Sequence, residues 1–282
     1  MTKATSALLT SLVVWAALPS LTQDALHPHE LNEPPGWAEA PSSQADPGLW
    51  ECAGYGGSVI VSLEEGSVRI GKPPDEEPQQ DPLPQHLKLS KEMVGGHSLL
   101  RTADGWLVGF DDGEFGGGLW WFNSEGDQNR KLLSENVHSI YRSPDGILVL
   151  VGLAHLSLDS GKLYRFTETT EEVAVKLVAD LGGSPEASAL DPEGRLVVAT
   201  PRSVVAVDYT GNVFRLYKSG ENLIYPTSVV IDSTGNIFVG MRFFVLRLVP
   251  GNNAQFQPQW LMPTECKSFR IVKRICTCGV SR

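Results

Sequence analysis

A repeated segment with a turn glycine constrains the fold of this chain more than any other feature of its sequence. Each copy has a short strand pattern, a turn of the Asp-Gly or Ser-Thr-Gly kind, and a second strand rich in Val, Ile and Leu. The copies recur about 40 to 50 residues apart, a spacing typical of repeated structural units. They cover residues 97–110, 138–151, 186–200 and 227–240, with turn glycines Gly105, Gly146, Gly194 and Gly235. The glycines predict turn positions with positive φ, which Gly adopts at little cost.

Two further strand patterns follow each copy. A third strand is expected at residues 118–123, 162–167, 203–208 and 243–249, and a more polar fourth strand follows, as near Arg130 and Phe214. Four short strands per unit at this period are typical of the blades of a β-propeller. The chain is therefore predicted to be an all-β protein with a propeller of five blades. Six blades is the alternative, if the loop at residues 73–84 hides further strands.

The two ends of the domain are predicted to build the fifth blade together. Three strands are expected at residues 50–52, 58–64 and 86–90, and one more at residues 268–276. Pairing of N-terminal and C-terminal strands in one blade would close the propeller and remove free sheet edges, which invite aggregation. The propeller domain is placed at residues 48–282.

The first residues predict an export signal followed by an arm. Residues 7–18 are a compact apolar run, about as long as a signal-peptide core and too short to span a bilayer. We therefore assign residues 1–23 to a signal peptide, with an uncleaved membrane anchor as the alternative. Residues 24–47 are expected to be a Pro-rich linker or arm. The mature chain is predicted to be a periplasmic or secreted monomer without a membrane span.

All four cysteines lie in the presumed mature chain, at Cys52, Cys266, Cys276 and Cys278. An even number in an exported protein suggests disulfides, and Cys52 is expected to pair with Cys276 or Cys278 across the fifth blade. A metal site at Cys276 and Cys278 is a weaker alternative, because no second pair stands at ligand spacing.

The charge of the chain limits its partners. Its formal net charge is -10 and its pI is about 5.1. Binding to a nucleic-acid backbone needs clustered Lys and Arg, so nucleic acid is excluded as a partner, and anionic lipid is disfavoured. A small molecule or an extracytoplasmic protein remains as the expected partner.

Residues 225–240, which begin Tyr225-Pro226-Thr227, resemble the core of NHL-type repeats. The repeat pattern over residues 95–250 is also similar to gluconolactonase and strictosidine-synthase-like propellers. The resemblance implies the propeller fold. It does not decide the function, because these folds include lactonases, lyases and plain binding scaffolds.

The residues that enter the first strand of each blade are candidate site residues. They are His97, His138, Glu186 and Thr227, and propeller geometry is expected to gather them at one channel mouth. His97, His138 and Glu186 could bind a divalent metal such as zinc, since imidazole nitrogen and carboxylate oxygen suit it. Amidating-lyase-type NHL propellers place His at comparable positions, so the resemblance also points to a metal. The alternative is that these side chains hydrogen-bond neighbouring loops.

Loops between second and third strands are expected on the same face. One carries Asp111, Asp112 and Glu114, and the next carries His155 and Asp159. Such carboxylates could bind calcium or act as acid and base, although a solvated loop is the simpler interpretation. The predicted ligand-binding face consists of Asp111, Asp112, Glu114, His155 and Thr227.

The sequence leaves the function between two hypotheses. The first is an exported module that binds a ligand or a protein, because the blades are regular and catalytic signatures are weak. The alternative is a metal-dependent hydrolase or lyase of the lactonase kind, with His97, His138 and Glu186 as ligands. No Gly-x-Ser-x-Gly, phosphate-binding loop or His-Glu-x-x-His motif is present in the sequence.

Overall fold

The computed structural model describes residues 33–40, 57–75, 80–169, 171–220, 223–251 and 255–266, and the backbone of residues 269–272 and 275–278. All of them belong to the second of the two units into which the chain divides, Glu33–Arg282. In this part of the chain the elements are strands, apart from one single-turn 3-10 helix. Within the described residues, no helix is long and apolar enough to span a lipid bilayer. The predicted signal peptide, residues 1–23, lies outside the described residues.

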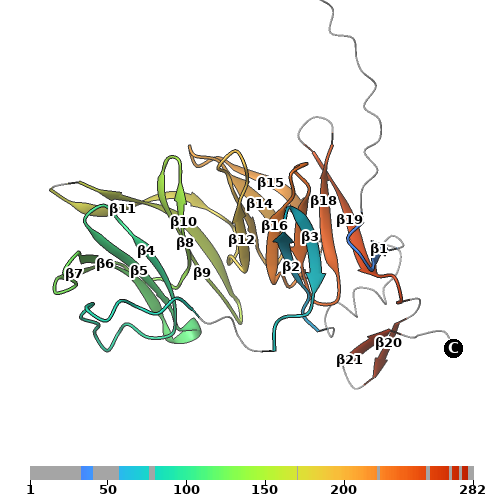
Figure 1. Cartoon of the computed structure of the whole chain (residues 1–282), viewed down its shortest axis with the longest axis horizontal. Coiled ribbons are helices and arrows are strands. Elements are labelled where there is room, and N and C mark those ends of the chain that lie inside the picture. The colour runs from blue at the N-terminus through green and yellow to red at the C-terminus, as the bar shows by residue number, and fades with distance from the viewer. Residues whose placement is uncertain are drawn as a thin grey trace, which may run out of the picture. The chain divides into compact units, whose positions relative to one another are not determined.

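Four sheets with four consecutive strands each follow one another along the chain (Figure 1). Each is an antiparallel meander, and in chain order we call them the first to fourth blade. They consist of β4 (Gly96–Arg101), β5 (Gly105–Asp111), β6 (Gly117–Asn123) and β7 (Asn129–Leu133); β8 (Val137–Ser143), β9 (Gly146–His155), β10 (Leu158–Glu168) and β11 (Val173–Asp180); β12 (Ala187–Leu190), β13 (Leu196–Ala199), β14 (Ser203–Val207) and β15 (Val213–Lys218); and β16 (Ser228–Ile231), β17 (Ile237–Gly240), β18 (Val245–Pro250) and β19 (Phe256–Pro263). The predicted second and third strands are confirmed in all four blades.

The first strands of successive blades lie side by side. The Ser98 hydroxyl on β4 donates to the His138 carbonyl on β8 at 3.3 Å. The Tyr141 hydroxyl on β8 is 2.8 Å from the Ser188 hydroxyl on β12, and β12 in turn contacts β16. Buried Val, Leu and Ile side chains fill the space between neighbouring blades. This packing brings the starts of the first strands, where the candidate site residues stand, close together.

The four turn glycines are required for two different reasons. Gly146, Gly194 and Gly235 have φ of 121°, 80° and 83°, which confirms the predicted left-handed turn positions. Gly105 is not among the residues with positive φ, so this part of the prediction is wrong. A Cβ at Gly105 would lie 1.8 Å from the carbonyl oxygen of Phe122 on the neighbouring strand. Glycine is needed there because two backbones approach closely, not because of the turn.

Two of the tight turns share one hydrogen-bonded motif. Asp208 Oδ1 accepts bonds from the amide of Thr210, its hydroxyl and the amide of Asn212. Asp232 makes the same set of bonds in the next blade. The hydrogen bond from the Thr210 hydroxyl is the main cause that lowers the pKa of Asp208 to about 2. The motif Asp-x-Thr-Gly-Asn is thus a structural turn, with the aspartate as its acceptor.

Of the predicted fifth blade, the described residues show two hairpins. β2 (Ile60–Glu64) pairs with β3 (Ser67–Gly71), and β20 (Phe269–Val272) pairs with β21 (Ile275–Cys278). No strand forms at residues 86–90, and residues 50–52 lie outside the described residues. Glu65 and Gly66 have φ of 50° and 79°, as two-residue hairpin turns require. This local turn gives β2 its neighbour in sequence as a partner. The expected pairing of residues 50–52 with residues 268–276 involves residues outside the described part, so it stays a prediction.

An N-terminal strand nevertheless pairs with a C-terminal one. β1 (Trp37–Glu39) lies antiparallel to β19 and extends the fourth blade to five strands. The segment lies within residues 24–47, the predicted linker or arm. The hairpin β2–β3 is also attached to the fourth blade, where the Ser228 hydroxyl accepts the amide of Val61 at 2.8 Å. An N-terminal and a C-terminal segment thus pair in the fourth blade, through a strand, β1, that was not predicted from the sequence.

Candidate functional site

Three of the four predicted entering residues share one pocket. His138, Glu186 and Thr227 line a hollow of about 300 Å³ between the starts of β8, β12 and β16. Tyr141 and Ser188 also line it, and we call it the His138 pocket. The propeller arrangement alone explains this convergence, because equivalent residues of successive blades start neighbouring first strands.

His97 lies apart from these three residues. Its amide donates to Gln80 Oε1 at 3.0 Å, and its Nε2–H donates to the Asp81 carbonyl at 2.8 Å. It lines a second hollow of about 280 Å³, which shares Ser139 and Tyr141 with the His138 pocket. The loop before the first blade thus holds the His97 ring, as the alternative interpretation of a hydrogen-bonded imidazole expected.

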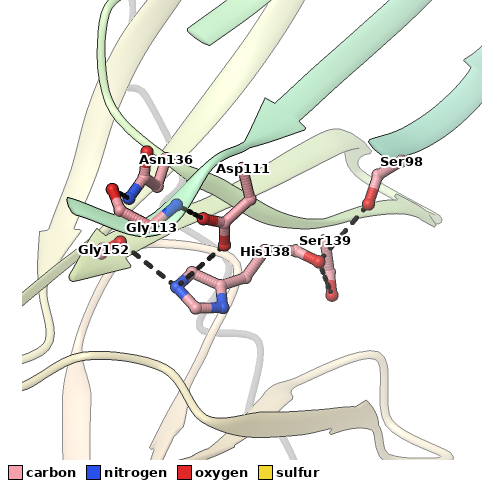
Figure 2. A network of polar contacts seen from close by, with 7 residues as sticks. All are labelled: Ser98, Asp111, Gly113, Asn136, His138, Ser139 and Gly152. Atoms are coloured by element: carbon pink, nitrogen blue, oxygen red, sulfur yellow. Dashed lines mark hydrogen bonds and ion pairs between the residues drawn. The ribbon is translucent and has the colours of Figure 1, made fainter. Parts of the chain in front are cut away.

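The imidazole of His138 is held from one side (Figure 2). Its Nε2 lies 3.1 Å from the Gly152 carbonyl, which can only accept, so this nitrogen carries a proton. The same nitrogen is 3.7 Å from Asp111 Oδ2, and both side chains are about one quarter exposed, at 26% and 27%. Asp111 Oδ1 in turn accepts the amide of Gly113 at 2.9 Å. Nδ1 points away from this network, and in the described part of the chain no group hydrogen-bonds to it.

Glu186 brings a carboxylate with an altered affinity for protons. The residue as a whole is exposed, yet its carboxyl group is partly desolvated in the pocket, and this burial raises its pKa. The nearby His138 opposes the rise, whereas the carboxylates of Asp159 and Asp111 add to it. Glu186 is thus the carboxylate that lines the pocket, and the negative charges of Asp111 and Asp159 lie close enough to affect it.

Two neighbours of the pocket were missed in the sequence. Asn136 is 5% exposed, and its Nδ2 donates to the Gly113 carbonyl at 2.6 Å, so that it supports the loop after Asp111. Ser184 is fully buried, and its amide donates to Asp159 Oδ1 at 2.7 Å. Each stands two residues before an entering position, and this regular placement is the signal that could have identified them.

The remaining predicted face residues have other contacts. His155 Nε2 is 2.9 Å from Glu114 Oε2, which joins the loops of the first and second blades. Asp112 caps the 3-10 helix η1 (Gly113–Phe115) without a side-chain hydrogen bond. Thr227 donates its hydroxyl to the Val59 carbonyl, so its side chain ties hairpin β2–β3 to the fourth blade. Thr227 lines the pocket but is mainly a structural residue.

The predicted metal and disulfide residues stay predictions. Among the described residues, no three His, Cys, Asp or Glu side chains gather closely enough to hold a metal ion. His97 in particular is turned toward Asp81 and does not line the pocket of His138 and Glu186. Cys266 is buried and disulfide-bonded. Cys52 and the side chains of Cys276 and Cys278 lie outside the described part, so the expected pairing is not tested.

The chain is a β-propeller protein. Its blades are four-stranded antiparallel sheets whose first strands lie next to one another, and a polar pocket lies among the starts of these strands. The predicted fold class is thereby confirmed, whereas five blades remains a prediction. Protein-family models give no match to this chain, and curated proteins give none either.

Solved structures similar to this chain include propellers of the group that the sequence resembles. A virginiamycin B lyase from Staphylococcus aureus matches with 12% identity over 58% of this chain and 55% of the lyase, at a TM-score of 0.41. A gluconolactonase from Xanthomonas campestris matches with 13% identity over 58% and 55%, at a TM-score of 0.34. An auxiliary nutrient binding protein from Bacteroides ovatus matches with 10% identity over 60% and 42%, at 0.40. The chain thus spans about half the length of these proteins or less.

Proposed function

We propose that the protein binds a small polar ligand in the His138 pocket, as an exported binding module. The observation that carries this proposal is the convergence of His138 and Glu186 from successive blades in one open hollow of about 300 Å³. A hollow of this size accommodates a small molecule and not a protein segment. Export rests on the apolar run at residues 7–18.

The charges around the pocket define the class of ligand. Asp111, Asp159 and Glu186 act together there, and His138 is the single imidazole that opposes them. A ligand with an ammonium group, or with several hydroxyl donors, would find an acceptor on Glu186, which lines the pocket, while Asp111 and Asp159 add negative charge near it. His138 Nδ1 offers one further acceptor while the ring is neutral. An anionic ligand would meet repulsion.

Glu186→Gln is expected to weaken binding of a small amine by about 10- to 100-fold, the usual effect of losing a hydrogen bond to a charged group. Titration calorimetry with amines, neutral polyols and carboxylates of similar size measures this. Glu193→Gln, an exposed glutamate of the third-blade turn, is the matched control and should bind as the wild type does. Preference for the carboxylates, or equal binding by both variants, would contradict the proposal.

The binding should also depend on pH in a defined direction. Because burial raises the pKa of Glu186, its carboxyl stays protonated at pH values where an ordinary glutamate is ionised. Affinity for an amine should therefore increase as the pH rises through this range, and Glu186→Gln should remove that increase. The unliganded protein should lose a little stability over the same range, since its folded state holds the proton more tightly than the unfolded chain does.

The second candidate function is a metal-dependent hydrolase or lyase that acts on a small molecule. His138 and the carboxylates near it are donors that zinc or calcium accepts. Among the described residues, however, no three such side chains lie close enough together to hold a metal ion. Metal analysis of protein purified without chelator distinguishes the two functions. Stoichiometric metal that is lost in a His97→Ala/His138→Ala double variant would favour the enzyme.

A further inference from the structure

Two neighbouring loops beside the His138 pocket present large apolar side chains to solvent. Phe115, at the end of η1, is 82% exposed. Leu156 and Leu158, at the turn between β9 and β10, are 94% and 51% exposed. A single exposed apolar side chain is ordinary on a protein surface, but a group on adjacent loops is a mark of an interaction site.

The conformation of Leu156 makes its presence more unusual. His155 pairs with Leu158, so Leu156 is the first residue of a two-residue hairpin turn. Its φ is 54°, in the left-handed region that favours Gly, Asn or Asp at this position. Leucine is thus unfavourable here twice, through its strained backbone and through its exposed side chain. A residue that costs stability on both counts is best explained by a contact that it makes elsewhere.

A side-chain contact between His155 and Glu114 holds the two loops together. Glu114 Oε2 and His155 Nε2 are 2.9 Å apart. Phe115 directly follows Glu114, and Leu156 directly follows His155. The pair therefore joins the loops from which the two apolar side chains project, so that both belong to one surface.

We propose that Phe115, Leu156 and Leu158 form a docking surface for a protein partner with an apolar hollow edged by Lys and Arg side chains. Projecting side chains fit a hollow in a macromolecule, and two loop tips are more than a small ligand would cover. The carboxylates of Asp112, Glu114 and Asp159 lie on or next to the same loops, and the chain carries a net charge of -10. A basic rim complements them. This surface goes beyond the small-ligand function and does not depend on it.

The first test separates a docking role from a structural one. Leu156→Asn should leave the melting temperature unchanged or raise it by about 2–4 °C, because asparagine tolerates positive φ and an exposed position. Leu177→Asn, at a half-exposed leucine in β11, is the matched control and should not raise it. A clear fall in melting temperature for Leu156→Asn would overturn the proposal, since leucine would then be retained for stability.

The second test asks what the surface binds. A phage library of random peptides is selected on the wild type and counter-selected on a Phe115→Ser/Leu156→Asn double variant. Enriched peptides should combine apolar side chains with Lys or Arg, bind the double variant at least about tenfold more weakly, and lose affinity with salt. His138→Ala should leave their binding unchanged, which separates this surface from the pocket.

Three results would overturn the proposed partner. The first is a selection that yields only acidic peptides or peptides that bind the double variant equally well. The second is self-association of the wild type that the double variant loses, which would assign the surface to a second copy of the chain. The third is binding of the wild type, but not of the double variant, to phosphatidylcholine vesicles, which would assign the surface to a membrane.

Discussion

Glu168→Ala is expected to lower the free energy of unfolding by about 2–4 kcal/mol, because one carboxylate joins the first two blades. Oε1 accepts the Thr102 hydroxyl at 2.9 Å and Trp121 Nε1 at 2.7 Å. Oε2 accepts the amides of Ala103 at 2.8 Å and Asp104 at 3.4 Å. The alanine variant would leave these donors without their acceptor. The loss matters most for the Thr102 hydroxyl, because Thr102 is only 6% exposed. Urea unfolding followed by tryptophan fluorescence measures the change.

Two further variants identify the cause of that loss. Glu168→Gln keeps the shape and one acceptor oxygen but turns an NH₂ group toward other donors, so an intermediate loss is expected. Glu171→Ala changes an exposed glutamate nearby and should cost less than about 0.5 kcal/mol. A Glu168→Ala protein as stable as Glu171→Ala would show that the bridge between the blades contributes nothing.

Gly105→Ala is expected to cost about 3 kcal/mol or more, at or above the upper end of the usual cost of overpacking. A Cβ at this position would lie 1.8 Å from the Phe122 carbonyl oxygen and 3.2 Å from the Cα of Asn123. These are backbone atoms of β6, so the clash is relieved only by moving two paired strands apart. The same urea experiment, with near-ultraviolet circular dichroism as a second probe, measures the loss.

Gly71→Ala is the matched control, since it makes the same change in strand β3. No described atom lies within 4 Å of a Cβ at Gly71, and its φ is not in the left-handed region. Alanine there should leave stability unchanged or raise it slightly, because it restricts the unfolded chain. Equal effects at Gly105 and Gly71 would mean that the close approach of β5 and β6 relaxes without cost.

The candidate site was predictable as a position in the repeat but not as a set of contacts. The period of the repeat placed His138, Glu186 and Thr227 at equivalent starts of first strands, and these three do line one pocket. The same period also placed His97 there, yet its ring bonds to the Asp81 carbonyl in a loop outside the repeat. A repeat specifies where a side chain starts, whereas its hydrogen-bond partner depends on segments that the repeat does not describe.

What the sequence by itself determined is the blade: a meander of short strands with turns set by nearby residues. Gly146, Gly194 and Gly235 have the predicted positive φ because each turn is completed within a few residues. Only the tertiary structure decided which distant strands meet. β1 pairs with β19, more than two hundred residues away, and Gly105 is required by the Phe122 carbonyl of a neighbouring strand. A tight turn needs particular residues at neighbouring positions, so it leaves a recognisable pattern in the sequence. Pairing between strands far apart in the chain depends on backbone hydrogen bonds, which any sequence can form, so it leaves no such pattern.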